Sequence, residues 1–406
     1  MSVKDRIMSL ITVKNIAVVL LALILISGSA YGKASIANTL MRIDQIYTDN
    51  ISENTSGVGI TIDGVPIKDG TVDGRDISTL ATSASAIVTR DGTGNYSCDG
   101  VADNVQIQAA IDAVYAAGGG KVVIKEGNYS IASTVNVKQN IELEGVGIAT
   151  NLALANDVNA PVLKVNQANN VAIRSLHIDG NKAGQSSGSA VEVDGYTWLV
   201  TLSDLTVTNA KESGIWFTSD TSSYSYEPHL ERIAVTRCGG SGFTLGYCMD
   251  AVGIDLYAES NGEYGFKHYD SGGNYFHSHA YNNSGAYGIY VDPSAVNNRF
   301  VASFSENNAE HGIMIKGNGT SLVDCYINDN SKSNAGWYNG IVVQDAVNCT
   351  VSNCRITDTK VSKTQNKPIV EVGSGNFNLF IGNMIGGNTV NTIDVVGAQT
   401  QTAYNI

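Results

Sequence analysis

The sequence predicts an all-β fold, a parallel β-helix in which the chain winds into stacked coils. A glycine followed by an apolar residue recurs every 23–28 residues, at Gly214-Ile215, Gly242-Phe243, Gly265-Phe266, Gly288-Ile289, Gly312-Ile313 and Gly340-Ile341. The 43 glycines, only 5 prolines and 43% hydrophobic residues suit many short strands joined by tight turns. A recurring spacing of this length is typical of a solenoid, whereas a β-sandwich would need hairpin turns and no such period.

Residues 1–30 carry the pattern of an export signal. Three basic residues, Lys4, Arg6 and Lys14, precede the apolar run 16–26, and small residues follow up to Ala30. This order is typical of a secretory signal cleaved after Ala30. The apolar run is short for a membrane span, which needs about 20 residues. We therefore expect an extracellular or cell-surface protein, with an uncleaved N-terminal membrane anchor as the alternative.

Two segments are expected between the signal and the solenoid. Residues 33–49 carry apolar residues at helical spacing and predict a helical stalk over residues 31–59, which would either lie on the end of the solenoid or self-associate as a trimer. Residues 60–78 alternate short apolar pairs with Asp-Gly turns and predict a connector over residues 60–89. The connector resembles segments of trimeric viral fibres, so a homotrimer is one alternative and a plain linker is the other.

A helix is expected at about 103–118, at the start of the solenoid. Asp103 is the predicted N-cap, and Gln106 would complete a capping box. Three consecutive glycines, 118–120, would end the helix. Its apolar stripe consists of Ile107, Ala110, Ile111 and Val114. Such a helix would plug the open end of the coil and cover edge strands that otherwise aggregate.

Residues 90–131 resemble the N-terminal cap of the pectate-lyase-like superfamily. The resemblance rests on Asp99, Gly100, Asp103, Ile107, Gln108, Ala110, Ile111, Asp112, Gly119, Gly120, Gly127 and Tyr129. It implies a right-handed parallel β-helix over residues 90–406. It implies no single activity, because lyases, hydrolases, epimerases, tailspikes and inert fibres share this fold.

The repeats predict which residues stack on one another, about 4.8 Å apart. Inward aliphatic columns are expected from Leu202/Leu205/Val207, Leu230/Ile233/Val235, Leu322/Cys325/Ile327 and Val351/Cys354/Ile356. Asparagine recurs at the turns, where it tolerates left-handed conformations, at Asn209, Asn261, Asn283, Asn307 and Asn328.

The cysteines offer candidate disulfides. Cys325 and Cys354 fall at equivalent inward positions of adjacent coils, so they form either a disulfide or a reduced ladder in the core. Cys238 and Cys248 flank one strand and are a second candidate pair. The chain lacks the CxxC pairs of a zinc site. Candidate glycosylation sequons lie at Asn50, Asn54, Asn95, Asn128, Asn282, Asn318 and Asn348.

The richest outward surface is expected on three consecutive coils between residues 255 and 305. Its predicted outward residues are Asp255, Tyr257 and Glu259, then His277, His279 and Tyr281, then Ser303 and Ser305, with Phe276, Ser278 and Ala280 facing inward. A neighbouring face would carry Lys267, Tyr269, Tyr290 and Asp292. A slip of one residue would turn His277 and His279 inward.

Carboxylate, imidazole and phenol groups side by side suit chemistry on a sugar ring, and aromatic rings stack on its apolar face. We therefore predict catalytic roles for Asp255, Glu259, His277, His279 and Arg299. Substrate-binding roles are predicted for Tyr257, Tyr281, Lys267, Tyr269, Tyr290 and Asp292. The His-x-His pair has no third ligand of clear spacing, so no metal site is assigned.

No catalytic signature of the superfamily is complete in this chain. Pectate lyases of this fold use several calcium-binding carboxylates and an Arg base, but no run of acidic ligands accompanies Arg299. Polygalacturonases carry an adjacent Asp pair, which this chain lacks. Alginate epimerases carry Asp-Pro-His-Asp, whereas here Asp292-Pro293 precedes Ser294-Ala295. The resemblance thus requires no cofactor and leaves Ca²⁺ as an optional ion.

Two classes of function remain open. The net charge of −13 disfavours nucleic acid as a partner. The first hypothesis is an exported protein that interacts with a polysaccharide or cell-surface glycan, either as a polysaccharide lyase or glycoside hydrolase or without turnover. The second is a non-catalytic structural fibre, adhesin or component of a cell envelope or sheath, in one version trimeric.

Overall fold

The computed structural model describes residues 60–62, 65–68, 71–72, 75–76, 85–219 and 221–406. The predicted signal or anchor and the predicted stalk lie outside these residues. Four short strands, β1 (Ile60–Ile62), β2 (Val65–Lys68), β3 (Thr71–Val72) and β4 (Arg75–Asp76), form a sheet of their own. Its β1–β2 and β2–β3 pairs are antiparallel. Within the described ranges, no helix is long and apolar enough to cross a membrane.

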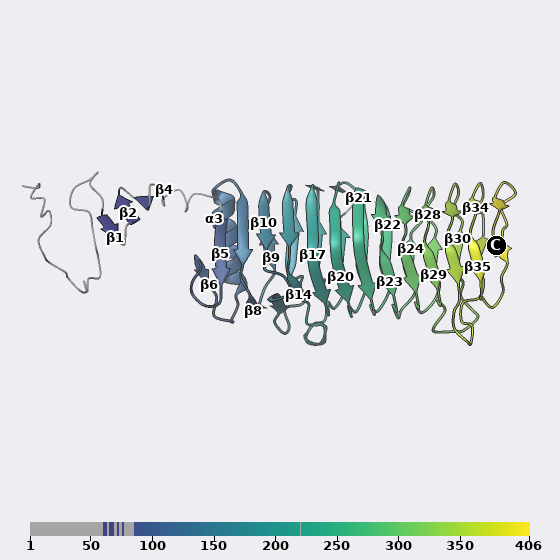
Figure 1. The fold of residues 1–406 in the computed structure, drawn as a ribbon, viewed down its shortest axis with the longest axis horizontal. Helices are drawn as coiled ribbons and strands as arrows, with labels where there is room; N and C mark the ends of the chain where they lie inside the picture. Colours follow the sequence, from purple (N-terminus) through teal and green to yellow (C-terminus); the bar gives the residue numbers. More distant parts are fainter. Residues whose placement is uncertain (1–59, 63–64, 69–70, 73–74, 77–84, 220) are drawn as a thin grey trace, which may run out of the picture. The chain divides into compact units, whose positions relative to one another are not determined.

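From Ser85 onward the chain forms a parallel β-helix whose strands stack in three columns, which we call faces A, B and C (Figure 1). Face A contains β9 (Val135–Val137), β12 (Leu163–Asn166), β15 (Val191–Asp194), β18 (Ile215–Thr218), the first parts of β21 (Phe243–Glu259) and β22 (Phe266–Phe276), β24 (Ile289–Val291), β27 (Ile313–Ile315), β30 (Ile341–Gln344), β33 (Ile369–Val372) and β36 (Ile393–Asp394).

Face B contains β5 (Ser85–Thr89), β7 (Gly120–Ile124), β10 (Ile141–Glu144), β13 (Val171–Arg174), the first parts of β17 (Val200–Thr208) and β20 (His229–Thr236), the middle of β21, the end of β22, β25 (Arg299–Val301), β28 (Ser321–Val323), β31 (Thr350–Ser352), β34 (Leu379–Ile381) and β37 (Gln401–Ala403). Strand β5 lies within the segment expected to be a connector, so the solenoid already includes residues 85–89.

Face C contains β8 (Gly127–Ile131), β11 (Thr150–Leu154), β14 (His177–Asp179), the ends of β17, β20 and β21, β23 (His279–Tyr281), β26 (Phe304–Glu306), β29 (Tyr326–Asn328), β32 (Arg355–Thr357) and β35 (Met384–Gly386). The remaining elements are β6 (Tyr96–Ser97), β16 (Thr197–Trp198), β19 (Ser225–Tyr226), the helix α3 (Asn104–Ala116) and the 3₁₀ turn Lys182–Gly184.

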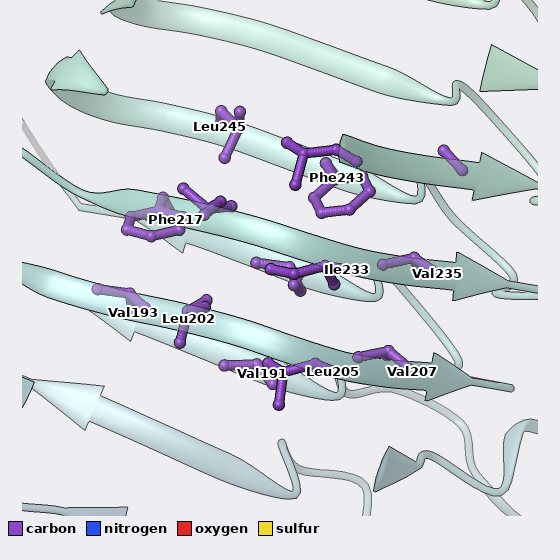
Figure 2. Close-up of a cluster of buried hydrophobic side chains, with 14 of the residues drawn as sticks. Val191, Val193, Leu202, Leu205, Val207, Phe217, Ile233, Val235, Phe243 and Leu245 are labelled. Atoms are coloured by element: carbon purple, nitrogen blue, oxygen red, sulfur yellow. The ribbon is translucent and has the colours of Figure 1, made fainter. Parts of the chain in front are cut away.

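The recurring glycine-apolar pairs stack as predicted. Ile215 pairs with Phe243, Phe243 with Phe266, and the column continues in register through Ile289, Ile313 and Ile341. The Phe243 and Phe266 rings stack with centroids 4.9 Å apart. Figure 2 shows side chains of this kind, from neighbouring coils, packed together in the interior. The predicted parallel β-helix is therefore confirmed.

Helix α3 buries its predicted stripe, because Ile107, Ala110, Ile111 and Val114 are all buried against the first coils. The predicted capping box is wrong. The Asp103 carboxylate makes no bond to the helix end and instead accepts hydrogen bonds from the Gly100 and Ser130 N–H groups, at 2.8 Å each. Asp103 thus connects the segment that precedes helix α3 to strand β8.

Asparagines form a buried ladder at the turn between faces C and A. Asn261, Asn283, Asn308 and Asn330 each donate a side-chain hydrogen bond to the amide oxygen of the equivalent residue one coil on, and Gln365 and Asn388 extend the column. Asn261 and Asn283 were predicted at turns. The next two members of the ladder are Asn308 and Asn330. The predicted Asn307 and Asn328 lie beside the ladder. Asn209 and Asn307 adopt positive φ.

Candidate functional site

A groove of about 350 Å³ lies on the outer side of face A. Its walls combine two aromatic rings, Trp216 and Tyr269, with ammonium and carboxylate groups. The charged residues of the lining are Lys211, Glu212, Glu263 and Lys267. Outward side chains of β18 and β22 therefore meet charged residues of the turns that precede face A.

The two aromatic residues are held together by a hydrogen bond. Trp216 Nε1 donates to the Tyr269 hydroxyl oxygen at 3.1 Å. Tyr269 reaches Trp216 because it lies across Gly246 of the intervening strand β21. A Cβ atom at Gly246 would lie 2.0 Å from the Tyr269 ring. The missing side chain at Gly246 thus makes room for the ring, and partial burial raises the pKa of Tyr269, which keeps the phenol neutral.

Lys267 lies between two aromatic groups. Its Nζ atom is 5.9 Å from the centroid of Tyr269 and 5.7 Å from that of Tyr264. Both distances are in the range of cation–π attraction. Tyr264 in turn stacks on Tyr290 with centroids 5.2 Å apart. Two of the predicted binding residues, Lys267 and Tyr269, therefore lie in the groove, and Tyr290 lies next to it.

The aromatic surface continues along the stack of coils beyond Tyr290. Tyr287 contacts both Tyr290 and His311, and His311 contacts Tyr338. Burial lowers the pKa of His311 to about 4, and its Nδ1 accepts a hydrogen bond from the Asn339 N–H at 2.8 Å. His311 is therefore a neutral aromatic member of this surface. Asp292 accepts a hydrogen bond from the Tyr290 hydroxyl at 3.0 Å.

Face C carries the other part of the predicted surface. Tyr257, His279 and Phe304 stand in one outward column, with ring centroids 5.2 and 5.3 Å apart. His279 Nε2 lies 2.9 Å from a carboxylate oxygen of Glu306. Burial, reinforced by the charge of Glu259, raises the pKa of Tyr257 to about 12. Tyr281 lies in the next outward column, between Glu259 and Glu306.

Asp255 and His277 occupy a corner between faces B and C. Both have positive φ, 54° and 51°, and their side chains form an exposed pair with 3.4 Å between His277 Nδ1 and an Asp255 carboxylate oxygen. Arg299 is exposed at the start of β25 on face B. The five predicted catalytic residues therefore lie on a corner and two faces rather than in one cavity.

The corner also explains three wrong orientations. A single residue in the left-handed conformation turns the chain from face B to face C, as Asp255, His277 and Ala302 do in successive coils. This extra residue shifts the in-out alternation by one position. Phe276 consequently faces outward, while Ser303 and Ser305 are buried. Ser278 and Ala280 do face inward.

Trp216 and Tyr264 were not singled out from the sequence, although a usable signal exists. A tyrosine precedes the recurring glycine in two successive coils, at Tyr264-Gly265 and Tyr287-Gly288. Residues that precede a stacked glycine must themselves stack, so this repeat places tyrosines along one edge of face A. Trp216, two residues after Gly214, stands in the same outward column as Lys267 and Tyr290.

The remaining candidate groups have clear positions. In the described part of the chain, no group of three or more His, Cys, Asp or Glu could hold a metal ion. All six cysteines are buried free thiols. Cys238 donates its N–H to Asn261, whereas Cys248 pairs with Ser225 and Ser271, so these two lie in different columns. Among the described sequons, the asparagines Asn95, Asn128, Asn318 and Asn348 are exposed, and Asn282 is half-buried.

Comparisons with known proteins agree with this architecture. A family model described as "Right handed beta helix region" matches residues 189–336. Among curated proteins, mannuronan C5-epimerase AlgE4 of Azotobacter vinelandii is 28% identical over 190 residues, which is 41% of this chain and 34% of the relative. AlgE5 of the same organism is 27% identical over 235 residues, 48% of this chain and 23% of the relative. The chain thus spans about a third or less of these relatives.

Solved structures show the same fold. The A-module of AlgE4 from Azotobacter vinelandii superposes with a TM-score of 0.62 at 19% identity, over 78% of this chain and 99% of that chain. Tailspike protein 2 of the Escherichia coli O157:H7 bacteriophage CAB120 gives a TM-score of 0.58 at 11% identity, over 69% of this chain and 40% of that chain. The protein described here therefore has the right-handed parallel β-helix fold.

Proposed function

We propose that this protein binds a polysaccharide chain in the groove on face A. The observation that carries the proposal is the hydrogen-bonded pair of Trp216 and Tyr269 beside Lys267. Aromatic rings offer apolar faces to sugar rings, while the ammonium and carboxylate groups of the groove can bond sugar hydroxyls or acidic substituents. The similarity to proteins named mannuronan C5-epimerases supports a polysaccharide as the ligand. No reaction is assigned, because the predicted catalytic residues are spread over two faces and a corner.

Two substitutions test this site. We expect Trp216→Ala to weaken binding about tenfold, which corresponds to the roughly 1.4 kcal/mol of one aromatic contact. Gly246→Ala removes no aromatic group, yet it should weaken binding similarly because the new methyl displaces the Tyr269 ring. Binding is measured on an array of polysaccharides that includes polymannuronate, with and without Ca²⁺.

Tyr196→Ala is the matched control, since Tyr196 is 51% exposed and lies outside the groove. Its affinity should equal that of the unsubstituted protein. A protein that binds no polysaccharide on the array, or whose binding survives both groove substitutions, would refute the proposal. Product analysis of every bound polysaccharide then tests for turnover.

We further propose that the mature protein is exported and begins at Tyr31. The charged, apolar and small-residue order of residues 1–30 supports this. Expression of the full chain in a secreting bacterium should release a protein whose N-terminal sequence is Tyr-Gly-Lys. A product retained in the membrane with residues 1–30 intact would establish the anchored alternative. Light scattering of the released protein then distinguishes a monomer from the trimer that a self-associating stalk would give.

A further inference from the structure

One pair of cysteines in the solenoid is stacked directly, coil on coil. Strand β28 pairs with β31 so that Val323 aligns with Ser352, and β29 pairs with β32 so that Tyr326 aligns with Arg355. Both pairings have the same offset in sequence. Cys325 and Cys354 lie between the paired residues, so they occupy equivalent positions in adjacent coils. In the two preceding coils the column they share contains Ser278 and Ser303, and the Ser278 N–H donates to the Ser303 hydroxyl at 3.2 Å.

The spacing of these two cysteines suits a covalent bond. Stacked strands lie roughly 4.8 Å apart, and the Cα atoms of disulfides are usually about 4.4–6.8 Å apart. Both side chains point inward and are 1% exposed. The two thiols make the same contact, because each donates to the carbonyl of the residue two positions before it, Val323 at 3.4 Å and Ser352 at 3.3 Å. The two side chains therefore have the same orientation in adjacent coils.

The other four cysteines have no such partner. Cys238 lies in the column of the asparagine ladder, and Cys248 is stacked between two serines. The Cys349 N–H donates a hydrogen bond to the amide oxygen of Asn378 in the next coil. Cys98 lies beside Asp103 in the first coil. A disulfide framework would therefore consist of one bond.

We infer that Cys325 and Cys354 form a disulfide when the protein folds under oxidising conditions. The two thiols lose two protons and two electrons to a disulfide oxidant such as oxidised glutathione, which is reduced to two thiols, and one S–S bond forms. Because both sulfur atoms are buried in the finished coil, the exchange takes place before the two coils close on each other. The bond encloses residues 326–353, one full coil, and fastens that coil to the next.

Mass spectrometry on the full exported chain tests this inference. The protein is refolded in a mixture of reduced and oxidised glutathione, its remaining thiols are alkylated in denaturant, and its peptides are mapped without reduction. We expect a linked Cys325–Cys354 peptide and four alkylated cysteines. Adding dithiothreitol should then lower the melting temperature.

Matched variants separate this bond from other effects. The variant Cys238→Ser/Cys248→Ser should keep the linked peptide and its sensitivity to dithiothreitol. The variant Cys325→Ser/Cys354→Ser should show no linked peptide and no effect of dithiothreitol. Six alkylated cysteines in the refolded wild-type protein, or a linked peptide joining other cysteines, would overturn the inference even if a variant failed to fold. Neither outcome depends on polysaccharide binding.

Discussion

Replacing Asn283 by alanine should cost about 4 kcal/mol of folding stability. Its Nδ2 donates to the Asn308 amide oxygen at 2.9 Å and to the Ala258 carbonyl at 3.1 Å. Its Oδ1 accepts from the N–H and the side-chain amide of Asn261, both at 3.1 Å. The side chain is 1% exposed, so water cannot replace these partners, and each buried group left unpaired costs about 1–3 kcal/mol.

The measurement is denaturation by guanidinium chloride, followed by circular dichroism. Asn136→Ala is the control, because Asn136 is exposed on strand β9 and its side chain takes no part in the ladder. The control should change stability by less than about 0.5 kcal/mol. Equal midpoints for the two variants would mean that the ladder contributes nothing to stability. Because coils of a solenoid can unfold in separate groups, we also expect Asn283→Ala to broaden the transition.

The aliphatic columns could be predicted from the sequence because their spacing is set by the chain itself. One residue of each coil, such as Ile215 or Phe266, must fall under its equivalent in the next coil if strands are to pair. The Asn ladder was predicted only in part. Asn307 and Asn308 are adjacent, and the sequence does not say which of them faces inward.

The candidate site was predicted less well, for a related reason. A corner made by one residue, such as His277, adds only one position between two strands. That one position nevertheless reverses which side chains are expected to face inward on one side of the corner. His279 and Tyr257 were placed outward on one face, and they are. Lys267 and Tyr269 were also placed outward. Their partner Trp216 is 53 residues away from Tyr269 in the sequence, and the two residues come together only because the coils stack on one another.

One inward column of face A carries two polar residues that were not predicted from the apolar pattern. It runs through Phe217, Leu245, His268, Val291, Ile315 and Val343 to Glu371. His268 is fully buried between rings of Tyr275 and Phe300, and burial lowers its pKa to about 3. It is therefore a neutral core residue. Glu371, in contrast, has a complete set of hydrogen-bond donors near the C-terminal end of the solenoid.

Replacing Glu371 by alanine should also lower folding stability by about 3–4 kcal/mol at neutral pH, since it leaves several buried hydrogen-bond donors without an acceptor. One carboxylate oxygen accepts from Asn378 Nδ2 at 2.6 Å and from the Thr400 hydroxyl at 2.7 Å. The other accepts from the N–H groups of Val396 and Gly397, at 2.9 and 2.8 Å. The carboxylate thus ties the loop after β36 onto the last coils, and its loss should loosen residues 394–403 first.

The dependence on pH distinguishes this role from mere packing. Burial alone would raise the pKa of Glu371, but the hydrogen bonds from Gly397, Thr400, Asn378 and Val396 outweigh it and hold the pKa below its ordinary value of 4.5. A group with a depressed folded pKa stabilises the protein above its unfolded pKa, and this contribution is lost as the pH falls through the folded pKa. The difference in melting temperature between wild type and Glu371→Ala should therefore be constant above about pH 5 and shrink at lower pH.

Two further variants complete this test. Glu371→Gln keeps the size of the side chain but turns an amide NH₂ toward backbone N–H donors, so it should be destabilised at neutral pH and should lack the acid-dependent change. Glu126→Ala, in an exposed turn, should behave as wild type at every pH. If the melting-temperature difference for Glu371→Ala stayed constant down to pH 3, the carboxylate charge would have no part in holding the C-terminal loop, and packing alone would account for its burial.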